Sequence, residues 1–184
     1  KRPAIIITLV LVVFVASLLL FPLVGVSFFP KAEKPQFIIN INTPKGTNLL
    51  ETERAVNYVE SVLDQQEQVA HYASNIGHGN PRIYYNIIPL RERSTHAQIF
   101  VLLDEYRPNQ FRAMVDKLRQ QFSNYAGADI EIKELEQGPL VDAPIAIRLL
   151  GENLTTLERI SRDVEHIISS TKGTLNIHNP FSTT

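Results

Sequence analysis

The sequence predicts an α+β protein in which a membrane-spanning helix precedes soluble units built from strands and helices. Residues 3–30 contain no charged side chain. From residue 36 onward, strand-like alternation and helix-like periodicity follow one another along the chain. Turns rich in glycine and proline separate these segments, and 184 residues suffice for one ordinary domain and part of a second.

The segment 4–21 is almost wholly aliphatic. A helix needs about 20 apolar residues to cross ~30 Å of hydrocarbon. A secretory signal peptide has a shorter apolar run of about 7–15 residues that ends in a small-x-small cleavage site. The sequence at 24–27 is a poor cleavage site, and a buried core helix seldom lacks every polar face. Region 1–30 is therefore predicted to be a transmembrane helix and its exit.

Charged residues flank this segment on both sides. Lys1 and Arg2 favour a cytoplasmic start, whereas Lys31 and Lys34 at the other end offset them. The charges alone therefore leave the orientation open.

Region 31–140 predicts a ferredoxin-like (split βαβ) unit, because its elements follow the order β-α-β-β-α-β. Asn48 precedes Glu51 at the spacing of a helix-capping box. The expected elements are a strand at 36–43, a helix at 49–63, strands at 69–76 and 97–103, a helix at 108–122, and a strand at 128–133. A further short strand is expected at 83–88.

Region 141–184 predicts the first β-α-β of a second, incomplete unit of the same kind. Strands are expected at 145–150 and 174–177. The helix between them is expected to begin with a capping box formed by Thr155 and Glu158. Asn153 lies in an Asn-x-Thr glycosylation sequon, but a helix-capping role explains it without glycosylation.

In such a unit both helices pack on one face of the sheet, so the other face is solvated, covered, or used to hold something. The strand at 97–103 is apolar on both sides. That pattern indicates that the second face of the sheet is not fully exposed to solvent. It therefore suggests a partner surface or a cleft for an apolar ligand.

The composition excludes several functions. The net charge is −1 without a basic face, which gives no reason to expect a nucleic acid partner. There is no cysteine, so disulfides, thiolate metal sites and a cysteine nucleophile are excluded. None of the five histidines lies four residues from another, and no HExxH motif occurs. We expect no catalytic residue, no metal ligand and no cofactor.

Four strings of the sequence resemble the resistance-nodulation-division (RND) efflux pumps, specifically the hydrophobe/amphiphile exporter branch. Their order and spacing, rather than any one of them, make the resemblance specific, and it spans essentially the whole chain. The strings are FFPKAEKPQF at 28–37, TPKGT at 43–47, GHGNPR at 77–82 and GPLVDAPI at 138–145.

The resemblance implies a fragment containing the seventh transmembrane helix, one ferredoxin-like porter subdomain and the beginning of the next. It implies a homotrimer in the bacterial inner membrane, with the soluble part in the periplasm and the start of the chain in the cytoplasm. It also implies proton-driven export of amphiphilic small molecules, together with a periplasmic adaptor and an outer-membrane channel. The proton-relay residues of the family lie on other transmembrane helices.

The resemblance further implies where substrate is contacted: on two strands and on the loop from Ile76 to Arg82. The residues are Asn40 and Asn42 on the first strand, Ile76, His78, Asn80 and Arg82 in the loop, and Ile145, Ile147 and Leu149 on the strand after the break. Family members known for drug export often carry phenylalanines in this loop, where this chain has Gly77, His78 and Gly79. Core packing is the competing interpretation for the strand residues.

Two other functions stay open. A single-span, membrane-anchored extracytoplasmic sensor or binding module requires only one membrane crossing in the parent protein. An acylphosphatase-like enzyme would use Arg82 and an asparagine, with a phosphate-cradling loop directly after the first strand. Residues 44–47 are a poor candidate for such a loop.

Overall fold

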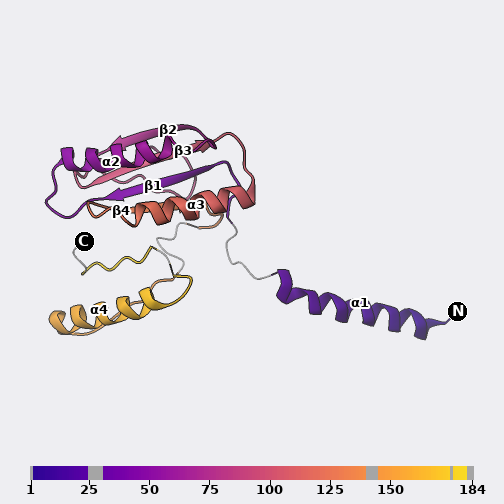
Figure 1. Cartoon of the computed structure of the whole chain (residues 1–184). Helices are drawn as coiled ribbons and strands as arrows, with labels where there is room; N and C mark the ends of the chain where they lie inside the picture. Colours follow the sequence, from indigo (N-terminus) through magenta and orange to yellow (C-terminus); the bar gives the residue numbers. More distant parts are fainter. Residues whose placement is uncertain (1, 25–30, 140–144, 175, 182–184) are drawn as a thin grey trace. The chain divides into compact units, whose positions relative to one another are not determined.

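The computed structural model describes residues 2–24, 31–139, 145–174 and 176–181 (Figure 1). It divides into two compact units, Lys1–Pro30 and Lys31–Thr184. The predicted exit at 25–30 and the predicted boundary at 140–141 lie outside the described residues.

Helix α1 (Pro3–Val24) is the predicted apolar helix. The window Pro3–Leu20 has a mean hydropathy of 2.9, which makes α1 long and apolar enough to cross a membrane by length and composition. The hydroxyl of Thr8 donates a hydrogen bond of 2.9 Å to the carbonyl oxygen of Ala4. Its polar group is thereby satisfied within the helix, as a hydrocarbon environment requires.

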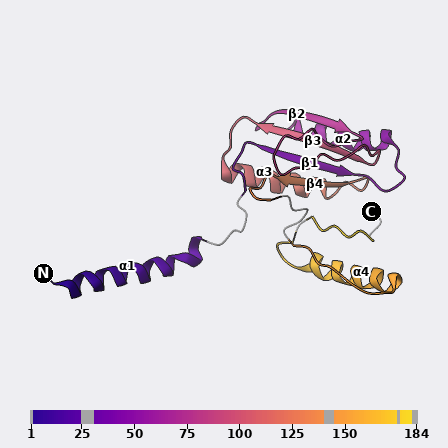
Figure 2. The same ribbon diagram turned by 180° about the vertical axis from the view of Figure 1, so that it is seen from behind.

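The α+β class and the β-α-β-β-α-β order are confirmed. Four antiparallel strands form one sheet in the order β2-β3-β1-β4, which is the ferredoxin-like arrangement. Figure 1 shows α2 and α3 in front of the sheet, and Figure 2 shows the strands in front. The elements are β1 (Gln36–Asn42), α2 (Leu49–Leu63), β2 (Val69–Ile76), β3 (His96–Leu103), α3 (Pro108–Phe122) and β4 (Asp129–Glu134).

The main core lies between the two helices and one face of the sheet. Phe37, Ile39 and Ile41 alternate along β1, point to this side, and are fully buried. They meet apolar stripes on the helices at a spacing of three to four residues, as the amphipathic patterns predict. The stripes consist of Ala55, Val56, Val59, Val62 and Leu63 on α2, and of Phe111, Met114, Val115, Leu118 and Phe122 on α3.

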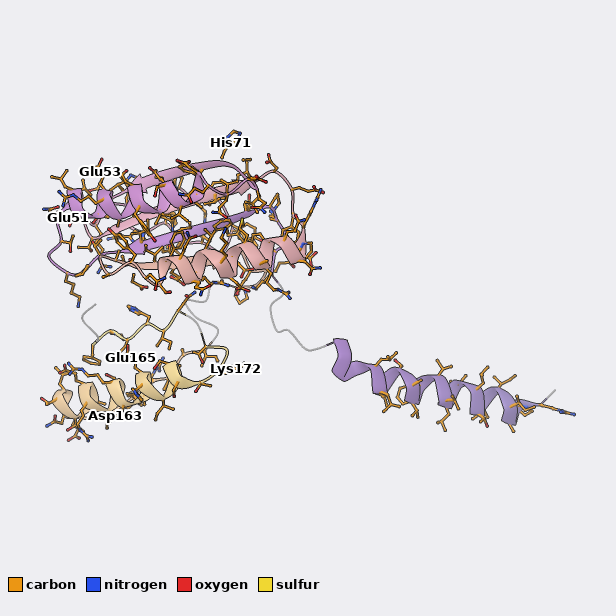
Figure 3. All side chains as sticks on the ribbon, viewed as in Figure 1. Glu51, Glu53, His71, Asp163, Glu165 and Lys172 are labelled. Atoms are coloured by element: carbon orange, nitrogen blue, oxygen red, sulfur yellow. The ribbon has the colours of Figure 1, made fainter. Side chains whose placement is uncertain are left out.

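Helix α2 begins where the sequence predicts. The side chain of Asn48 accepts a hydrogen bond of 2.9 Å from the backbone N–H of Glu51, which satisfies one free donor of the first turn. Figure 3 shows Glu51 at this end of the helix, where a negative charge is favourable. Inside the unit, the hydroxyls of Thr43 and Thr52 form a buried hydrogen bond of 2.9 Å that fixes the turn between β1 and α2.

The chain enters and leaves the sheet unit at the same place. Lys31 forms an antiparallel bridge with Glu136, and the N–H of Ala32 donates to the carbonyl of Leu135 at 2.8 Å. The ammonium of Lys31 lies 2.6 Å from Glu134 Oε1, and Arg119 lies 3.2 Å from the same oxygen. The segment that follows the apolar helix is thus bound to the end of β4.

Three predicted strands are absent from the described residues. Residues 83–88 form a loop with a turn, and neither 145–150 nor 174 and 176–177 is a strand, residue 175 lying outside the described part. A strand needs backbone partners in a neighbouring strand. No backbone hydrogen bond joins the described parts of these segments to the sheet.

Helix α4 (Leu154–Ser170) is the predicted helix of the C-terminal region, but its cap differs from the prediction. The side chain of Asn153 accepts a hydrogen bond of 2.9 Å from the N–H of Thr156. The predicted capping box of Thr155 and Glu158 is therefore wrong, because the cap is Asn153 and the helix starts two residues earlier than that box requires. The capping explanation of the sequon at Asn153 is confirmed.

Candidate functional site

A row of four polar residues crosses all four strands on the face of the sheet that carries no helix. In the strand register, Asn75 on β2 faces Gln98 on β3, Gln98 faces Asn40 on β1, and Asn40 faces Glu131 on β4. We call Asn75, Gln98, Asn40 and Glu131 the polar row. Side chains alternate between faces along a strand, so these four lie opposite the main core.

Hydrogen bonds join most of the polar row. Asn40 Nδ2 donates to Glu131 Oε2 at 3.3 Å, and Gln98 Nε2 donates to Asn40 Oδ1 at 2.7 Å. Gln98 Oε1 then accepts from the backbone N–H of Asn80 at 2.8 Å. Asn75 Nδ2 donates to the side chain of Asn80. The polar row therefore reaches beyond the sheet to the loop that follows β2.

Two glycines let that loop turn back against the sheet. Gly77 has φ +83°, a left-handed conformation that other residues rarely adopt, and its N–H donates to the carbonyl of His96 at 2.8 Å. At Gly79 a Cβ atom would lie 2.8 Å from the backbone nitrogen of Leu90, so a side chain would push the two parts of the loop apart. The result is the burial of Asn80, which is only 3% exposed.

His96 and Asn42 form a second polar pair on the same face, two residues further along β1 than Asn40. His96 Nδ1 donates to Asn42 Oδ1 at 2.8 Å, which leaves Nε2 as the lone-pair nitrogen of the neutral ring. Nε2 is buried and has no hydrogen-bond partner among the described residues. Burial, and secondarily the charge of Arg93, lower the pKa of His96 below its usual 6.5.

On the other side of the row the same face becomes apolar, and the chain covers it with its own loop. Ile87 packs with Ile38, Ala32 and Leu135 in a second, smaller core, and Phe100 contacts it. The face was predicted to be solvated, covered or used to hold something; here part of it is covered. The segment predicted as a strand at 83–88 instead supplies this cover.

Hydrogen bonds and a charged side chain anchor the cover. Asn86 Nδ2 donates to the carbonyl of Glu136 at 2.9 Å, and the hydroxyl of Tyr85 accepts from the N–H of Gly138 at 2.7 Å. The ammonium of Lys34 lies 5.0 Å from the centre of the Tyr84 ring, a cation–π contact. Large hydrophobic side chains stay exposed here: Ile83, Tyr85 and Ile88 in the cover, and Leu90 after it.

The buried His96 predicts a pH-dependent stability. The unfolded chain takes up a proton near pH 6.5, whereas the folded chain keeps the ring neutral to lower pH. The unfolding free energy therefore falls as the pH drops below about 6.5 and is unaffected by this group above it. Denaturation midpoints at pH 7.5 and 5.5 should differ less in His96→Gln than in the wild-type chain. An equal difference in both would contradict this role, and His71→Gln, at a side chain that projects away from the sheet (Figure 3), is the control.

Comparison with known sequences identifies the chain. No individual curated protein sequence matches it. The sequence profile of the AcrB/AcrD/AcrF family matches residues 1–183. The chain belongs to the AcrB/AcrD/AcrF family. The resemblance to RND efflux pumps inferred from the four strings is thereby confirmed.

Two solved structures show the same fold as this AcrB/AcrD/AcrF family chain. Both are crystal forms of a heavy metal efflux pump. The first has a TM-score of 0.64 and 12% identity over 96% of this chain. The second has a TM-score of 0.59 and 11% identity over 92%. The chain spans 19% and 18% of the length of those proteins, and at this identity the likeness concerns the fold alone.

The structure brings three of the residues predicted from the RND resemblance, Asn40, Asn42 and Asn80, to the helix-free face of the sheet. Asn40 and Asn42 are half-buried in the hydrogen-bonded groups described above, Asn80 is buried beside the row, and His78 is exposed in the same loop, where its Nδ1 donates to the carbonyl of Gly79 at 2.8 Å. Arg82 is exposed further along the loop. Ile76, in contrast, packs against the main core.

The remaining predicted residues follow residues 140–144, which lie outside the described part of the chain. Ile145 is 78% exposed, Ile147 is 57% exposed, and Leu149 is half-buried. None of them belongs to a strand in the described structure, and their role as substrate contacts stays a prediction.

The sequence reasoning missed Gln98, Glu131 and His96. Gln98 is 5% exposed although it is polar, and a lone polar residue in the apolar run at 97–103 was the available signal. Nothing in the sequence distinguishes Glu131 from an ordinary charged residue on the solvent-exposed side of a half-buried strand. The described residues contain no group of three or more His, Cys, Asp or Glu side chains placed to bind a metal.

Proposed function

We propose that this chain is part of a proton-driven RND pump that exports amphiphilic small molecules. The sequence profile match over residues 1–183 carries the proposal, because one family match includes both the apolar helix and the sheet unit. The proposed organisation is a transmembrane helix at 1–30, one periplasmic porter subdomain at 31–140 and the beginning of a second at 141–184.

The helix-free face supports a role in the substrate pathway. It combines the polar row with exposed apolar side chains, Ile83 and Ile88, of the segment that covers Ile38, and amphiphiles need both kinds of surface. Binding would rest on apolar burial at about 25 cal/mol per Å², with a few polar groups setting the orientation. Release would follow from a change between conformations of different affinity.

Heavy metal export is the alternative that the solved structures raise, since both come from a heavy metal efflux pump. Soft metals such as Cu(I) are bound by thiolates and thioethers. This segment has no cysteine, and its single methionine, Met114, is 5% exposed in the main core. The chemistry of the segment therefore favours organic amphiphiles.

The proposal places the parent protein in the bacterial inner membrane as a homotrimer. A periplasmic adaptor and an outer-membrane channel would be its partners, as in the family. A single-span sensor or binding module is the competing function, and it requires a parent protein that crosses the membrane only once. An acylphosphatase-like enzyme has little support, because Arg82 is exposed and far along the chain from the turn after β1.

The test uses the full-length parent protein in bacteria that lack their own exporters. Cells that express it should accumulate less of an apolar fluorescent dye, and a protonophore should abolish the difference. Asn42→Trp should change resistance to some compounds by about two- to tenfold, which corresponds to about 0.4–1.4 kcal/mol. Asn57→Trp, on the exposed side of α2, is the control at matched expression. Unchanged dye accumulation would refute export, and an unchanged compound profile would refute the role of this face.

A further inference from the structure

We propose that Glu131 is a positioning residue for the loop from Gly77 to Arg82, which it controls from the opposite edge of the sheet through Asn40 and Gln98. The inference rests on the proposed function only in assigning this loop to the substrate pathway. The positioning itself follows from the hydrogen bonds.

A series of hydrogen bonds runs from Glu131 through Asn40 and Gln98 to Asn80. The groups at its two ends set the direction of every bond in the series. An ionised carboxylate accepts hydrogen bonds and donates none, so Asn40 must present its NH₂ group to Glu131. Its carbonyl oxygen is then turned to β3 and must receive the NH₂ group of Gln98. Gln98 is left with its carbonyl oxygen directed at the loop. That oxygen meets a backbone N–H, which only donates.

The side-chain amides of Asn40 and Gln98 therefore each have one favourable orientation. If either amide is rotated by half a turn, donor faces donor or acceptor faces acceptor on both of its sides. Networks of this kind are favourable when fully satisfied and costly when partly satisfied, because buried polar groups lack water as a substitute partner.

The loop depends on this series of hydrogen bonds because Asn80 is buried. Its backbone N–H cannot turn to water while the loop stays in place, so losing Gln98 Oε1 as acceptor leaves an unpaired buried donor. The second link to the sheet, from Asn75 to the Asn80 side chain, does not satisfy that N–H. Displacement of Gly77–Arg82 is the way in which the N–H regains a partner.

Asn40 therefore helps to hold the loop in place, in addition to any contact that it makes with a substrate. Among the described residues, the side chain of Glu131 is hydrogen-bonded to Asn40 and not to the loop. Its effect must pass through two amide side chains on two strands.

The test replaces the acceptor at the Glu131 end of this series of hydrogen bonds by a donor. Glu131→Lys donates to Asn40, so Asn40 and then Gln98 must turn, and the NH₂ group of Gln98 is set against the N–H of Asn80. In the double variant Glu131→Lys with Asn40→Asp, the carboxylate introduced at position 40 accepts from both neighbours, so Gln98 keeps its orientation. Glu53→Lys makes the same charge change on the exposed side of α2 and is the control.

Hydrogen exchange of the full-length protein, followed by mass spectrometry, measures the loop directly. In Glu131→Lys the peptide that covers 77–82 should exchange about tenfold faster, as expected for the loss of one buried hydrogen bond. Peptides from α3 should be unchanged, which a general loss of stability would not allow. The double variant should return exchange at 77–82 to the wild-type rate.

Two results overturn the inference: unchanged exchange at 77–82 in Glu131→Lys, or no recovery in the double variant. Compound resistance measured on the same proteins separates this inference from the proposed function. Recovered exchange with resistance unaltered in every variant would uphold the positioning by Glu131 and refute the part of the loop in export.

Discussion

Phe37→Ala is expected to lower the unfolding free energy of the sheet unit by about 3–5 kcal/mol, the usual range for a fully buried phenylalanine. Phe37 is 0% exposed, and its ring lies 6.0 Å from that of Phe111 in an edge-to-face arrangement. The substitution removes apolar burial, leaves a cavity between β1 and α3, and breaks the aromatic pair. Natural domains are stable by only about 5–15 kcal/mol, so a large part of the fold's stability is at stake.

The measurement is denaturant unfolding of the 184-residue chain in detergent, followed by far-ultraviolet circular dichroism. Leu50→Ala is the matched control, because Leu50 lies on α2 and is 65% exposed. It should change the unfolding free energy by less than about 0.5 kcal/mol. Similar losses in the two variants would show that the sheet face bearing Phe37 is not the main core.

Val12→Arg is expected to prevent stable insertion of α1 into the membrane. An arginine at the centre of a transmembrane helix costs about 2.5–3.5 kcal/mol on insertion scales. Val12 lies near the middle of the window Pro3–Leu20, which contains no charged residue that could pair with it. The chain should therefore shift from the membrane fraction to the alkali-extractable fraction.

Alkaline extraction of membranes from cells that express the 184-residue chain measures this shift. Val12→Leu keeps the hydrophobicity and should remain in the membrane fraction. If Val12→Arg resists extraction as well as the wild-type chain does, α1 does not span the bilayer by its own hydrophobicity.

The elements that the sequence predicted correctly are those with a local cause. Helix α2 has both its apolar stripe and the cap at Asn48, and the side chains of β1 alternate between the main core and the helix-free face. The segment at 83–88 has equally strong strand formers, yet it forms a loop, because Ile87 is needed to cover Ile38. The apolar residues of this segment predict burial. They do not predict whether a neighbouring strand is available for pairing.

The candidate site was predictable only in part for a related reason. Asn40 stood out as a polar residue on an apolar strand. Its partners Gln98 and Glu131 lie 58 and 91 residues away along the chain, and they meet it only through the register of three strands. Register is set by tertiary packing and turns, so no spacing in the sequence indicates the polar row.

The bridge between Lys31 and Glu136 gives the sheet unit a pivot. Because Lys31 and Glu136 are joined at one point, any rotation of the unit about that point would move both of these residues together. Strands rise about 3.3 Å per residue, which places the Asn42 end of β1 roughly 20 Å from the end at Gln36. A tilt of only about 10° would carry that far end through roughly 3–4 Å while the pivot stays still. A small rotation at the attachment is thereby amplified at His96 and Asn42.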